Sequence, residues 1–417
     1  MEVKLHPMKN IATLTLSVAF LFSCTNNSKS TTEKDSTIND SIAKETEAAN
    51  TEYKPAFDGQ TRANYIKTKS AYEVLVVNES LGLPWAIVNL PDGKLLMTEK
   101  SGYMMIVDLQ KPYEIKKVTG LPKVNQYNQG GLLDVILDPN FDSNRTIYWT
   151  FSEPATDGSK NDQTSIAKGK LSLDETKVEN VQIIYRTFPS HDSGLHYGSR
   201  LVFDKEGYLY ASFGERSDDE MRKYAQDLKS PLGKIIKITT DGKAAPGNPF
   251  MDNKDALPEI YSLGHRSPQS LAFNDKGELW EVEHGPRGGD ELNLIQPGKN
   301  YGWPTITYGI EYAGGKISDG ATKHQGLEQP NYYWDPVIAP SGAEFYTGSI
   351  EEWKGNLFVG GMIKQALVRL VIEGNKVVGE EHILLDQKDR IRDMVTGKDG
   401  HLYAVGDNGK LYRIAKK

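Results

Sequence analysis

The side chains of this sequence best suited to chemistry are a histidine and an arginine set among glycines. His196 lies between Gly194 and Gly198, directly before a β-rich run. An unperturbed imidazole has a pKa of about 6.5, so histidine is the natural general base near neutral pH. Arg266 offers a rigid fork of donors to an anion or a carbonyl oxygen. A structural histidine, and an arginine paired with a carboxylate, are the alternatives at these two positions.

The segment 283–293, with the sequence EHGPRGGDELN, has the composition of a calcium site. Gly285 and Pro286 expose carbonyl oxygens, and Asp290 and Glu291 add carboxylates. Calcium prefers flexible sets of oxygen ligands, whereas zinc prefers nitrogen and sulfur. Neither HExxH nor CxxC occurs in the chain, so the sequence favours calcium over zinc.

Two further polar segments allow more than one interpretation. The segment 128–134 contains Gly130 and Gly131, which permit a close backbone approach or simply a tight turn. Arg390 and Arg392 are two residues apart, so on a strand both would point to one face. Two guanidinium groups on one face suit a polycarboxylate ligand. A surface strand of alternating charge is the alternative.

These segments lie between copies of one short pattern, in which a turn with Gly or Asn leads into a β-rich run. The copies, spaced by about 45 to 80 residues, occupy 92–97, 144–149, 206–211, 276–281, 354–359 and 399–404. Six repeats of one supersecondary unit predict an all-β, six-bladed β-propeller of four-stranded blades. Residues 71–77 can complete the last blade beside 410–414. A pair of β-sandwiches is the rival architecture, but six copies of one unit fit it poorly.

The N-terminal residues have the features of an export signal. Lys4 and Lys9 precede an apolar run at 11–22, which is too short to span a bilayer and is followed by Ser23 and Cys24, the only cysteine. We expect a lipoprotein signal peptide at 1–23, lipidation of Cys24 and a disordered tether at 24–61. An ordinary secretory signal is the alternative. The folded domain is expected at 62–417, exported and lipid-anchored in the cell envelope, in the periplasm or at the outer membrane.

The overall charge excludes one class of partner. The chain has 49 Lys and Arg against 56 Asp and Glu, a net charge of −7, so no basic field for nucleic acid exists. No apolar stretch of about 18 residues occurs, which excludes a polytopic membrane protein. Membrane contact is therefore expected through the N-terminal lipid only. The sequence leaves the oligomeric state open between monomer and homodimer.

Taken together, the motifs resemble the soluble pyrroloquinoline-quinone (PQQ)-dependent glucose and aldose sugar dehydrogenases. The resemblance covers about residues 70–416 and is carried by LGHRSPQSLAF at 263–273, EHGPRGGDELN at 283–293 and NYGWP at 300–304. It implies a six-bladed propeller that oxidises aldoses at the anomeric carbon to lactones, with PQQ and Ca²⁺ as cofactors. It also implies an electron acceptor, which the sequence does not identify.

The resemblance also implies roles for individual residues. His196 matches the general base for the anomeric hydroxyl, from whose carbon a hydride passes to calcium-bound PQQ, and Arg266 and Gln129 are implied to share the catalytic site. Implied cofactor-binding residues are Arg266, Ser267, His284, Asp290, Lys364, Arg390 and Arg392. The carbonyls of Gly285 and Pro286 match ligands of the cofactor calcium. Glu291 and Tyr301 match ligands of a second, structural calcium.

Three residues depart from the glucose dehydrogenase pattern. Leu195 replaces an Asp before the histidine and Ser267 replaces an Asn after the arginine, and both changes favour the aldose sugar dehydrogenase branch. Ile363 stands where the family has a cofactor-binding Lys, and Lys364 follows one residue later. A one-residue shift along a strand reverses the side-chain face, so this contact is either accommodated by the loop or lost.

Two alternatives to a dehydrogenase remain open from the sequence. A calcium-dependent propeller hydrolase, such as a sugar lactonase, would need a carboxylate-rich metal site on the propeller axis. A non-catalytic propeller that binds a ligand or partner would be consistent with Leu195 and the displaced Lys364.

Overall fold

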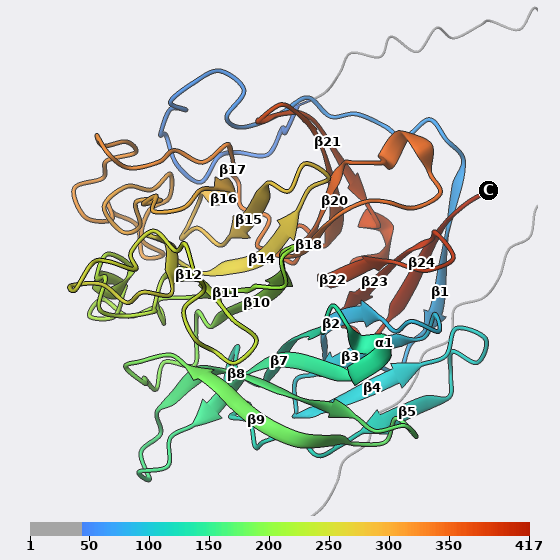
Figure 1. Cartoon of the computed structure of the whole chain (residues 1–417). Helices are drawn as coiled ribbons and strands as arrows, with labels where there is room; N and C mark the ends of the chain where they lie inside the picture. Colours follow the sequence, from blue (N-terminus) through green and yellow to red (C-terminus); the bar gives the residue numbers. More distant parts are fainter. Residues whose placement is uncertain (1–43) are drawn as a thin grey trace, which may run out of the picture. The chain divides into compact units, whose positions relative to one another are not determined.

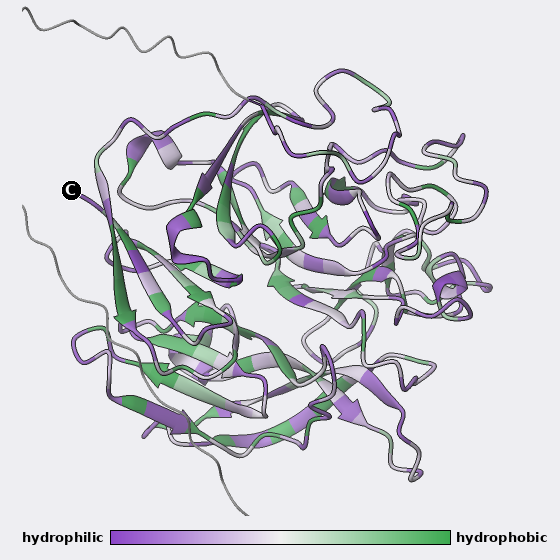
Figure 2. Cartoon of the chain, turned by 180° about the vertical axis from the view of Figure 1, so that it is seen from behind, coloured by the Kyte–Doolittle hydropathy of each residue, from purple (hydrophilic) through white to green (hydrophobic). Residues whose placement is uncertain are grey.

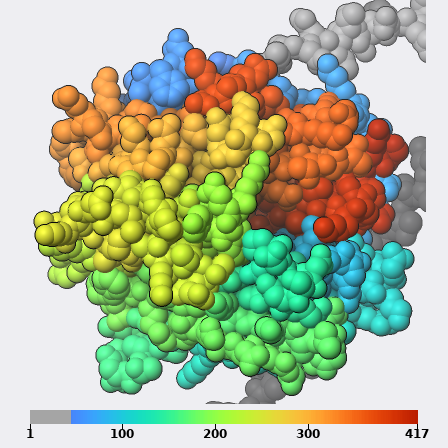
Figure 3. Space-filling view, viewed as in Figure 1, coloured from blue at the N-terminus to red at the C-terminus, as the bar shows by residue number. Residues whose placement is uncertain are grey.

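The computed structural model describes residues 44–417, which fold as a six-bladed β-propeller (Figure 1). Each blade is a four-stranded antiparallel sheet, and the predicted fold class is confirmed. In the space-filling view, the blades follow one another around the molecule in chain order (Figure 3). The sheets are single and arranged in a ring, which rules out the pair of β-sandwiches.

The first three blades each use four consecutive strands. Blade 1 contains β2 (Pro84–Asn89), β3 (Leu95–Glu99), β4 (Tyr103–Val107) and β5 (Ile115–Val118). Blade 2 contains β6 (Leu132–Leu137), β7 (Thr146–Pro154), β8 (Asp162–Leu171) and β9 (Val178–Arg186). Blade 3 contains β10 (Gly198–Phe203), β11 (Leu209–Phe213), β12 (Lys234–Ile238) and β13 (Ile260–Leu263).

The last three blades continue this order, and the sixth closes the ring. Blade 4 contains β14 (Pro268–Phe273), β15 (Leu279–Glu283), β16 (Asp290–Ile295) and β17 (Tyr332–Trp334). Blade 5 contains β18 (Pro340–Phe345), β19 (Leu357–Gly361), β20 (Ala366–Glu373) and β21 (Lys376–Ile383). Blade 6 contains β22 (Ile391–Thr396), β23 (Leu402–Gly406), β24 (Leu411–Lys416) and β1 (Tyr72–Asn78).

The pairing of β1 with β24 closes the propeller as the sequence predicts. The register is antiparallel and runs from Tyr72 opposite Lys416 to Asn78 opposite Leu411. The first strand of the fold therefore supplies the outer strand of the last blade. Helical structure in residues 44–417 is limited to short turns, namely α1 (Phe141–Asn144), η1 (Arg222–Ala225), η2 (Glu351–Trp353) and η3 (Leu385–Gln387).

The six sequence repeats mark one hairpin of each blade. Each copy leads into the second strand of its blade, which is β3, β7, β11, β15, β19 or β23. Five copies turn at a glycine with positive φ, between 74° and 87°, a conformation that costs glycine little. The sixth uses α1 and ends at Arg145, whose φ is 53°. The repeat is thus the turn between the first and second strands.

The first strand of each blade lies at the axis. These inner strands are β2, β6, β10, β14, β18 and β22, and each contacts the inner strand of the next blade around the ring. Near the start of all six, a bulge interrupts pairing with the second strand. A bulge redirects side chains and strengthens the local twist. The bulged stretches include Arg200, Gln269 and Arg392, so they place polar side chains at one end of the axis.

Hydrophobic side chains fill the spaces between neighbouring blades. Trp149 of blade 2 packs in one cluster with Val118 of blade 1, and Trp280 of blade 4 packs in another with Val359 of blade 5. Figure 2 shows hydrophobic residues concentrated on strands and hydrophilic ones along the loops. Burial of each large apolar side chain contributes roughly 1.5–3 kcal/mol. The blades therefore form a rigid support for the loops at their ends.

The N-terminal part of the described chain differs from the prediction. Residues 44–61 were expected to belong to a disordered tether, but they lie against the propeller. The Gln60 side chain is fully buried and donates a hydrogen bond to the carbonyl of Pro330 (2.9 Å). Polar hydrogen bonds, and not apolar burial, hold this segment, which is why composition alone did not reveal it. The predicted signal peptide, Cys24 and the tether up to residue 43 lie outside the described residues.

None of the helices found in residues 44–417 is long and apolar enough to cross a membrane.

Candidate active site

A cavity with polar walls lies at the end of the axis where the six inner strands begin. Its volume is about 490 Å³. Its walls include Trp85 at the start of β2, Leu133 of β6, Gly198 of β10 and Arg392 of β22. Blade loops and bulges therefore converge on one space, as expected for a propeller whose function lies on its axis.

His196 lies at the edge of this cavity and is held by a carboxylate. Its Nδ1 is 3.1 Å from Oε1 of Glu215, and only 5 % of the residue is exposed. An Nδ1–H that donates to Glu215 leaves Nε2 unprotonated, and Nε2 has no hydrogen-bond partner among residues 44–417. Its neighbours Tyr197 and Gly198 line the cavity, so His196 adjoins it without being one of the lining residues.

Burial keeps this histidine neutral. Burial, followed by the positive charge of Arg266, lowers the pKa of His196 below its ordinary value, while Glu215 acts in the opposite direction. The pKa of Glu215 is lowered in spite of its burial, chiefly by His196. An ionised carboxylate beside a neutral imidazole is the arrangement that a general base requires.

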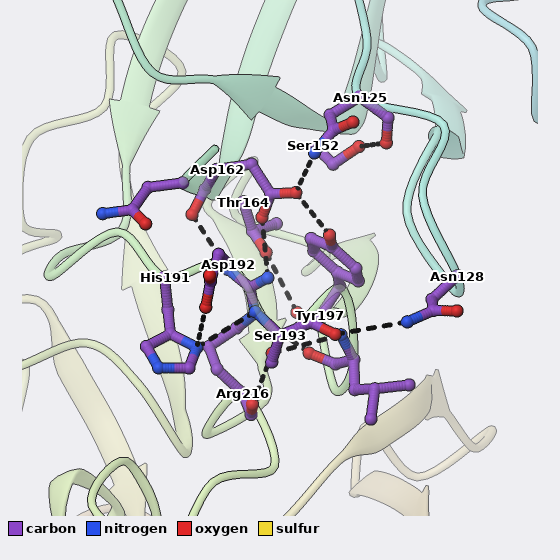
Figure 4. Close-up of polar contacts among 12 residues, drawn as sticks. Asn125, Asn128, Ser152, Asp162, Thr164, His191, Asp192, Ser193, Tyr197 and Arg216 are labelled. Atoms are coloured by element: carbon purple, nitrogen blue, oxygen red, sulfur yellow. Dashed lines mark hydrogen bonds and ion pairs between the residues drawn. The ribbon is translucent and has the colours of Figure 1, made fainter. Parts of the chain in front are cut away.

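A buried network fixes the loop that carries His196 (Figure 4). Asp162 accepts hydrogen bonds from the Tyr197 hydroxyl (2.6 Å), from Asn125 (2.6 Å) and from Arg216 (2.6 Å). Arg216 also donates to the carbonyl of Leu195 (2.9 Å) and lies over the ring of Tyr197. The residues on both sides of the histidine are therefore held by one carboxylate and one guanidinium.

The backbone conformation around His196 explains why glycines stand beside it. His196 itself has φ of 46°, and Gly194 and Gly198 have φ of 68° and 67°. A Cβ on Gly198 would lie 2.7 Å from the backbone nitrogen of Gly214. Strained backbone at a non-glycine residue often marks a functional position, because the surroundings must enforce it. Gln129 helps to do so, since its Oε1 accepts a hydrogen bond from the His196 backbone (2.8 Å).

Gly130 and Gly131 allow two segments of the protein's own backbone to approach each other closely. A Cβ on Gly130 would lie 2.6 Å from the Asn125 carbonyl oxygen, and one on Gly131 would lie 2.3 Å from that of Lys100. The close approach that the sequence suggested therefore involves the chain's own backbone. It positions Gln129 at the cavity wall.

Arg266 joins the histidine region to the Gly285–Pro286 turn. Its Nη1 donates to the carbonyl oxygens of His284 (3.0 Å) and Gly285 (2.8 Å), and its guanidinium lies 5.2 Å from the ring centroid of Trp303. Its Nε is buried without a hydrogen-bond partner. Arg266 is not among the residues lining the cavity, so it lies just behind the turn and has donor capacity left.

Asp290 holds the turn and the loop beside it. Its carboxylate accepts hydrogen bonds from the backbone N–H groups of Gly285 (2.8 Å), Ile338 (2.9 Å) and Ala339 (2.8 Å). Burial raises the pKa of Asp290 to about 7, although these donors act against the rise. This carboxylate thus positions two walls of the cavity, which it also lines.

Another wall of the cavity carries positive charge. Arg390 and Arg392 both line the cavity, together with Lys100. Asp407 accepts hydrogen bonds from Nε of Arg390 (2.9 Å) and from Nε of Arg392 (3.0 Å). One carboxylate shared by two arginines leaves excess positive charge for an anion. The predicted pairing of the two arginines on one side of a site is therefore observed.

Of the remaining predicted cofactor residues, His284 lines the cavity and Ser267 does not. The His284 Nε2 lies 2.6 Å from the carbonyl oxygen of Pro340, and burial lowers the pKa of His284 to about 3. Ser267 is fully buried and its Oγ accepts a hydrogen bond from Gln269, which does line the cavity. Ser267 therefore acts one layer behind the surface.

Lys364 is placed away from the cavity. Its Nζ pairs with Glu45 (3.1 Å) and Glu47 (2.7 Å) of the N-terminal segment. Ile363 lines the cavity in its place and is 60 % exposed. The one-residue shift seen in the sequence thus places Ile363 at the cavity and Lys364 away from it, within the turn that joins β19 and β20.

Glu291 and Tyr301, expected at a second calcium, meet at a small cavity of about 10 Å³ behind the turn. The hydroxyl group of Tyr301 donates a hydrogen bond to the carbonyl oxygen of Leu294 (2.7 Å), so this hydroxyl already has a partner within the protein. Burial and the charge of Glu283 raise the pKa of Glu291 well above its ordinary value. Nearby, ligand atoms of His265, Glu281 and Glu283 lie within 4.8 Å of one another. The region is rich in buried carboxylates that a cation would stabilise.

Sequence reasoning missed several residues of the site. Glu215 lies two residues beyond the end of β11, whereas Glu283 is the last residue of β15; a carboxylate near the end of the second strand of both blades was the available signal. Asn50 and Tyr312 also line the cavity, from segments without a recognisable motif.

Comparisons with known proteins agree with this geometry. Residues 81–413 match the family model described as glucose/sorbosone dehydrogenase. Aldose sugar dehydrogenase YliI of Escherichia coli is 39 % identical over 350 residues, which cover 82 % of this chain and 93 % of that protein. Quinoprotein glucose dehydrogenase B of Acinetobacter calcoaceticus is 25 % identical over 424 residues, covering 83 % and 88 %. The PQQ-bound structure of aldose sugar dehydrogenase from Streptomyces coelicolor is 27 % identical with a TM-score of 0.68, covering 84 % and 99 %.

Proposed function

Because the chain belongs to the glucose/sorbosone dehydrogenase family, we propose that it oxidises aldose sugars at the anomeric carbon to lactones, with PQQ as oxidant. One observation carries the proposal. The cationic Arg390–Arg392 wall and the Gly285–Pro286 turn line one axial cavity, and a histidine held by Glu215 directly adjoins the lining residues Tyr197 and Gly198. The names of the relatives support the substrate class and the cofactor.

The residues of the cavity suit these cofactors. Arg390 and Arg392 would hold carboxylates of the quinone, because guanidinium forks match carboxylate geometry. The carbonyls of Gly285 and Pro286 would contribute hard oxygen ligands to calcium. When bound, the quinone supplies a two-electron acceptor for the hydride of the anomeric carbon and the calcium polarises it as a Lewis acid.

His196 is the proposed base for the anomeric hydroxyl. Its unpartnered Nε2 takes the hydroxyl proton, and the Nδ1–H donated to Glu215 stabilises the imidazolium that results. Gln129 holds the backbone of His196, so the ring keeps its orientation while the proton moves. Arg266 fixes the carbonyl of Gly285 and contributes positive charge near the reacting groups.

Reconstitution tests the proposal. The purified chain is titrated with PQQ in the presence of Ca²⁺, and aldose-dependent dye reduction and lactone formation are followed. Turnover that requires the quinone, calcium and an aldose supports the dehydrogenase. Release of acid from a lactone without any electron acceptor, in a preparation that shows no aldose oxidation, would instead establish a hydrolase.

We further propose that the chain is exported and anchored through a lipid on Cys24, as the residues before 25 suggest. Metabolic labelling with a radioactive fatty acid checks this, with Cys24→Ala as the control. Label that persists in Cys24→Ala would contradict lipidation at this residue, and cell fractionation would identify the membrane.

A further inference from the structure

The segment 44–53, which we call the strap, forms part of the cavity wall. Asn50 lines the cavity beside Pro286, Val337 and Ile363. The strap precedes residues 81–413, the part of the chain that matches the family model. This wall of the cavity is therefore contributed by residues from outside the matched region.

Two separate attachments hold the strap in place. At one end, Asp335 accepts hydrogen bonds from the backbone N–H of Asn50 (2.5 Å) and from the backbone N–H (3.1 Å) and hydroxyl (2.7 Å) of Thr51. The hydroxyl of Thr51 also lies 3.2 Å from the carbonyl oxygen of Tyr308. A Cβ on Gly288 would lie 2.9 Å from Cγ2 of Thr51, so the strap packs closely on the 285–289 turn.

The second attachment uses the displaced lysine. Lys364 pairs with both Glu45 and Glu47, and its side chain is only 15 % exposed. Tyr65 donates a hydrogen bond to Glu45 (2.7 Å), and Arg62 donates to the carbonyl oxygens of Glu45 and Glu47. Burial would raise the pKa of Glu45, but hydrogen bonds from the Glu47 backbone N–H, Tyr65 and Lys364 outweigh it and lower this pKa to about 2. A carboxylate that stays ionised in this way forms a durable ion pair with Lys364.

The side chain of Asn50 has a fixed orientation. Its Oδ1 accepts a hydrogen bond from the backbone N–H of Val337 (3.2 Å), so Nδ2 must point the other way. Nδ2 has no hydrogen-bond partner among residues 44–417 and is not buried, so it can donate to a molecule in the cavity. A neutral, oriented amide donor is suited to a hydroxyl group, whereas the carboxylates of an anion are attracted by the arginine wall.

We propose that Asn50 is a specificity-determining residue, whose Nδ2 donates a hydrogen bond to a sugar hydroxyl away from the anomeric carbon. This inference rests on the proposed aldose oxidation. The anomeric end must lie at His196, so a second hydroxyl of the same sugar is the group left for the strap. In this arrangement Lys364 acts as a positioning residue for the strap and does not touch the ligand.

Steady-state kinetics of the full chain, loaded with PQQ and Ca²⁺, tests the role of Asn50. Asn50→Asp keeps an acceptor for the Val337 N–H but removes the donor, and Asn50→Ala removes both. We expect KM for the preferred aldose to rise roughly three- to tenfold in both variants, the loss of about one hydrogen bond. We expect kcat to change less than twofold. Asn180→Asp, an exposed position on β9, is the matched control and should leave KM unchanged.

Direct titration of PQQ, followed by fluorescence, separates the possible outcomes. Unchanged quinone affinity with raised KM supports the inference. Weakened quinone affinity, or KM equal to that of the wild-type chain in both variants, overturns it. If the wild-type chain oxidises no aldose, the proposed function itself fails and the inference falls with it. A thermal melt of each variant identifies any loss of folding.

Discussion

Two histidine–glutamate pairs occupy similar, although not equivalent, places in neighbouring blades. His196 precedes β10 and lies 3.1 Å from Glu215 after β11, whereas His265 precedes β14 and lies 3.3 Å from Glu283 at the end of β15. The second nitrogen distinguishes them. Nε2 of His265 is hydrogen-bonded to the hydroxyl of Ser262 (2.8 Å), while Nε2 of His196 has no partner within residues 44–417. Only one of the two histidines therefore has a lone pair to offer to a substrate.

The comparison shows that the blades can place a histidine beside a glutamate at more than one position. The surroundings of each pair determine whether its histidine is free to accept a proton. His265 is fully buried and its ring stacks on that of Tyr301 at 4.9 Å. His196 instead adjoins the cavity wall, in a strained loop between two glycines. Four experiments test this distinction, beginning with the one of largest expected effect.

Removal of the proposed base gives the largest effect. We expect His196→Gln to lower kcat/KM for an aldose by about 10²–10⁴, the usual contribution of a general base. PQQ affinity should be retained, because His196 does not belong to the arginine wall. Stopped-flow reduction of the bound quinone measures the chemical step directly. Full activity in this variant would show that the two histidines do not differ as described.

Removal of the orienting carboxylate should have a smaller effect. We expect Glu215→Gln to lower kcat by roughly 10- to 100-fold, because the imidazole loses its ionised partner while keeping a hydrogen bond. The negative charge that raises the pKa of His196 is also lost, so the acid limb of the pH profile should move to lower pH. An unchanged midpoint in the variant would contradict the assignment of that limb to His196.

The wild-type pH profile measures the same pair without mutation. A base must be unprotonated, so kcat/KM should be lost as the pH falls through the pKa of His196 and level off above it. Burial and Arg266 lower this pKa, so the midpoint should lie below the ordinary value of about 6.5. The rate with saturating quinone is measured between pH 4 and 9. A midpoint well above 6.5 would indicate a different titrating group.

Substitution of the buried partner should change stability and leave the chemical step nearly intact. We expect His265→Gln to lower the free energy of unfolding by about 1–3 kcal/mol, because two buried hydrogen bonds are disturbed. The kcat of the folded variant should change by no more than a few-fold. Urea denaturation and kinetics on the same sample check both parts. A loss of kcat similar to that of His196→Gln would remove the distinction between the pairs.

The sequence predicted most of the scaffold because the repeat has a direct physical cause. A turn residue with positive φ, followed by alternating apolar residues, marks one hairpin in each of six blades. The pairing of residues 71–77 with the C-terminal strand was also predictable, since an unpaired outer strand would leave the ring open. The polar strap was not, because its hydrogen bonds to Asp335 and Lys364 leave no periodic pattern.

The site was predicted in part, for a similar reason. Motifs identified His196 and the Gly285–Pro286 turn, which lie beside and at the cavity. Glu215 was missed because it lies 19 residues further along the chain, beyond β11 of the same blade, and only the fold brings it to His196. The direction of Lys364 was not predictable from strand register, because residues 362–365 form the turn between β19 and β20.

The closure of the ring by β1 and β24 has a consequence for how this chain acquires its structure. Blade 6 takes its outer strand from the beginning of the fold and its other three from the end. During synthesis, β1 emerges first and must wait until the final residues, up to Lys416, have been made before it gains its partner. A chain stopped a few residues early would leave two blade edges bare, and exposed strand edges promote aggregation. Closure of the ring therefore depends on the synthesis of β24.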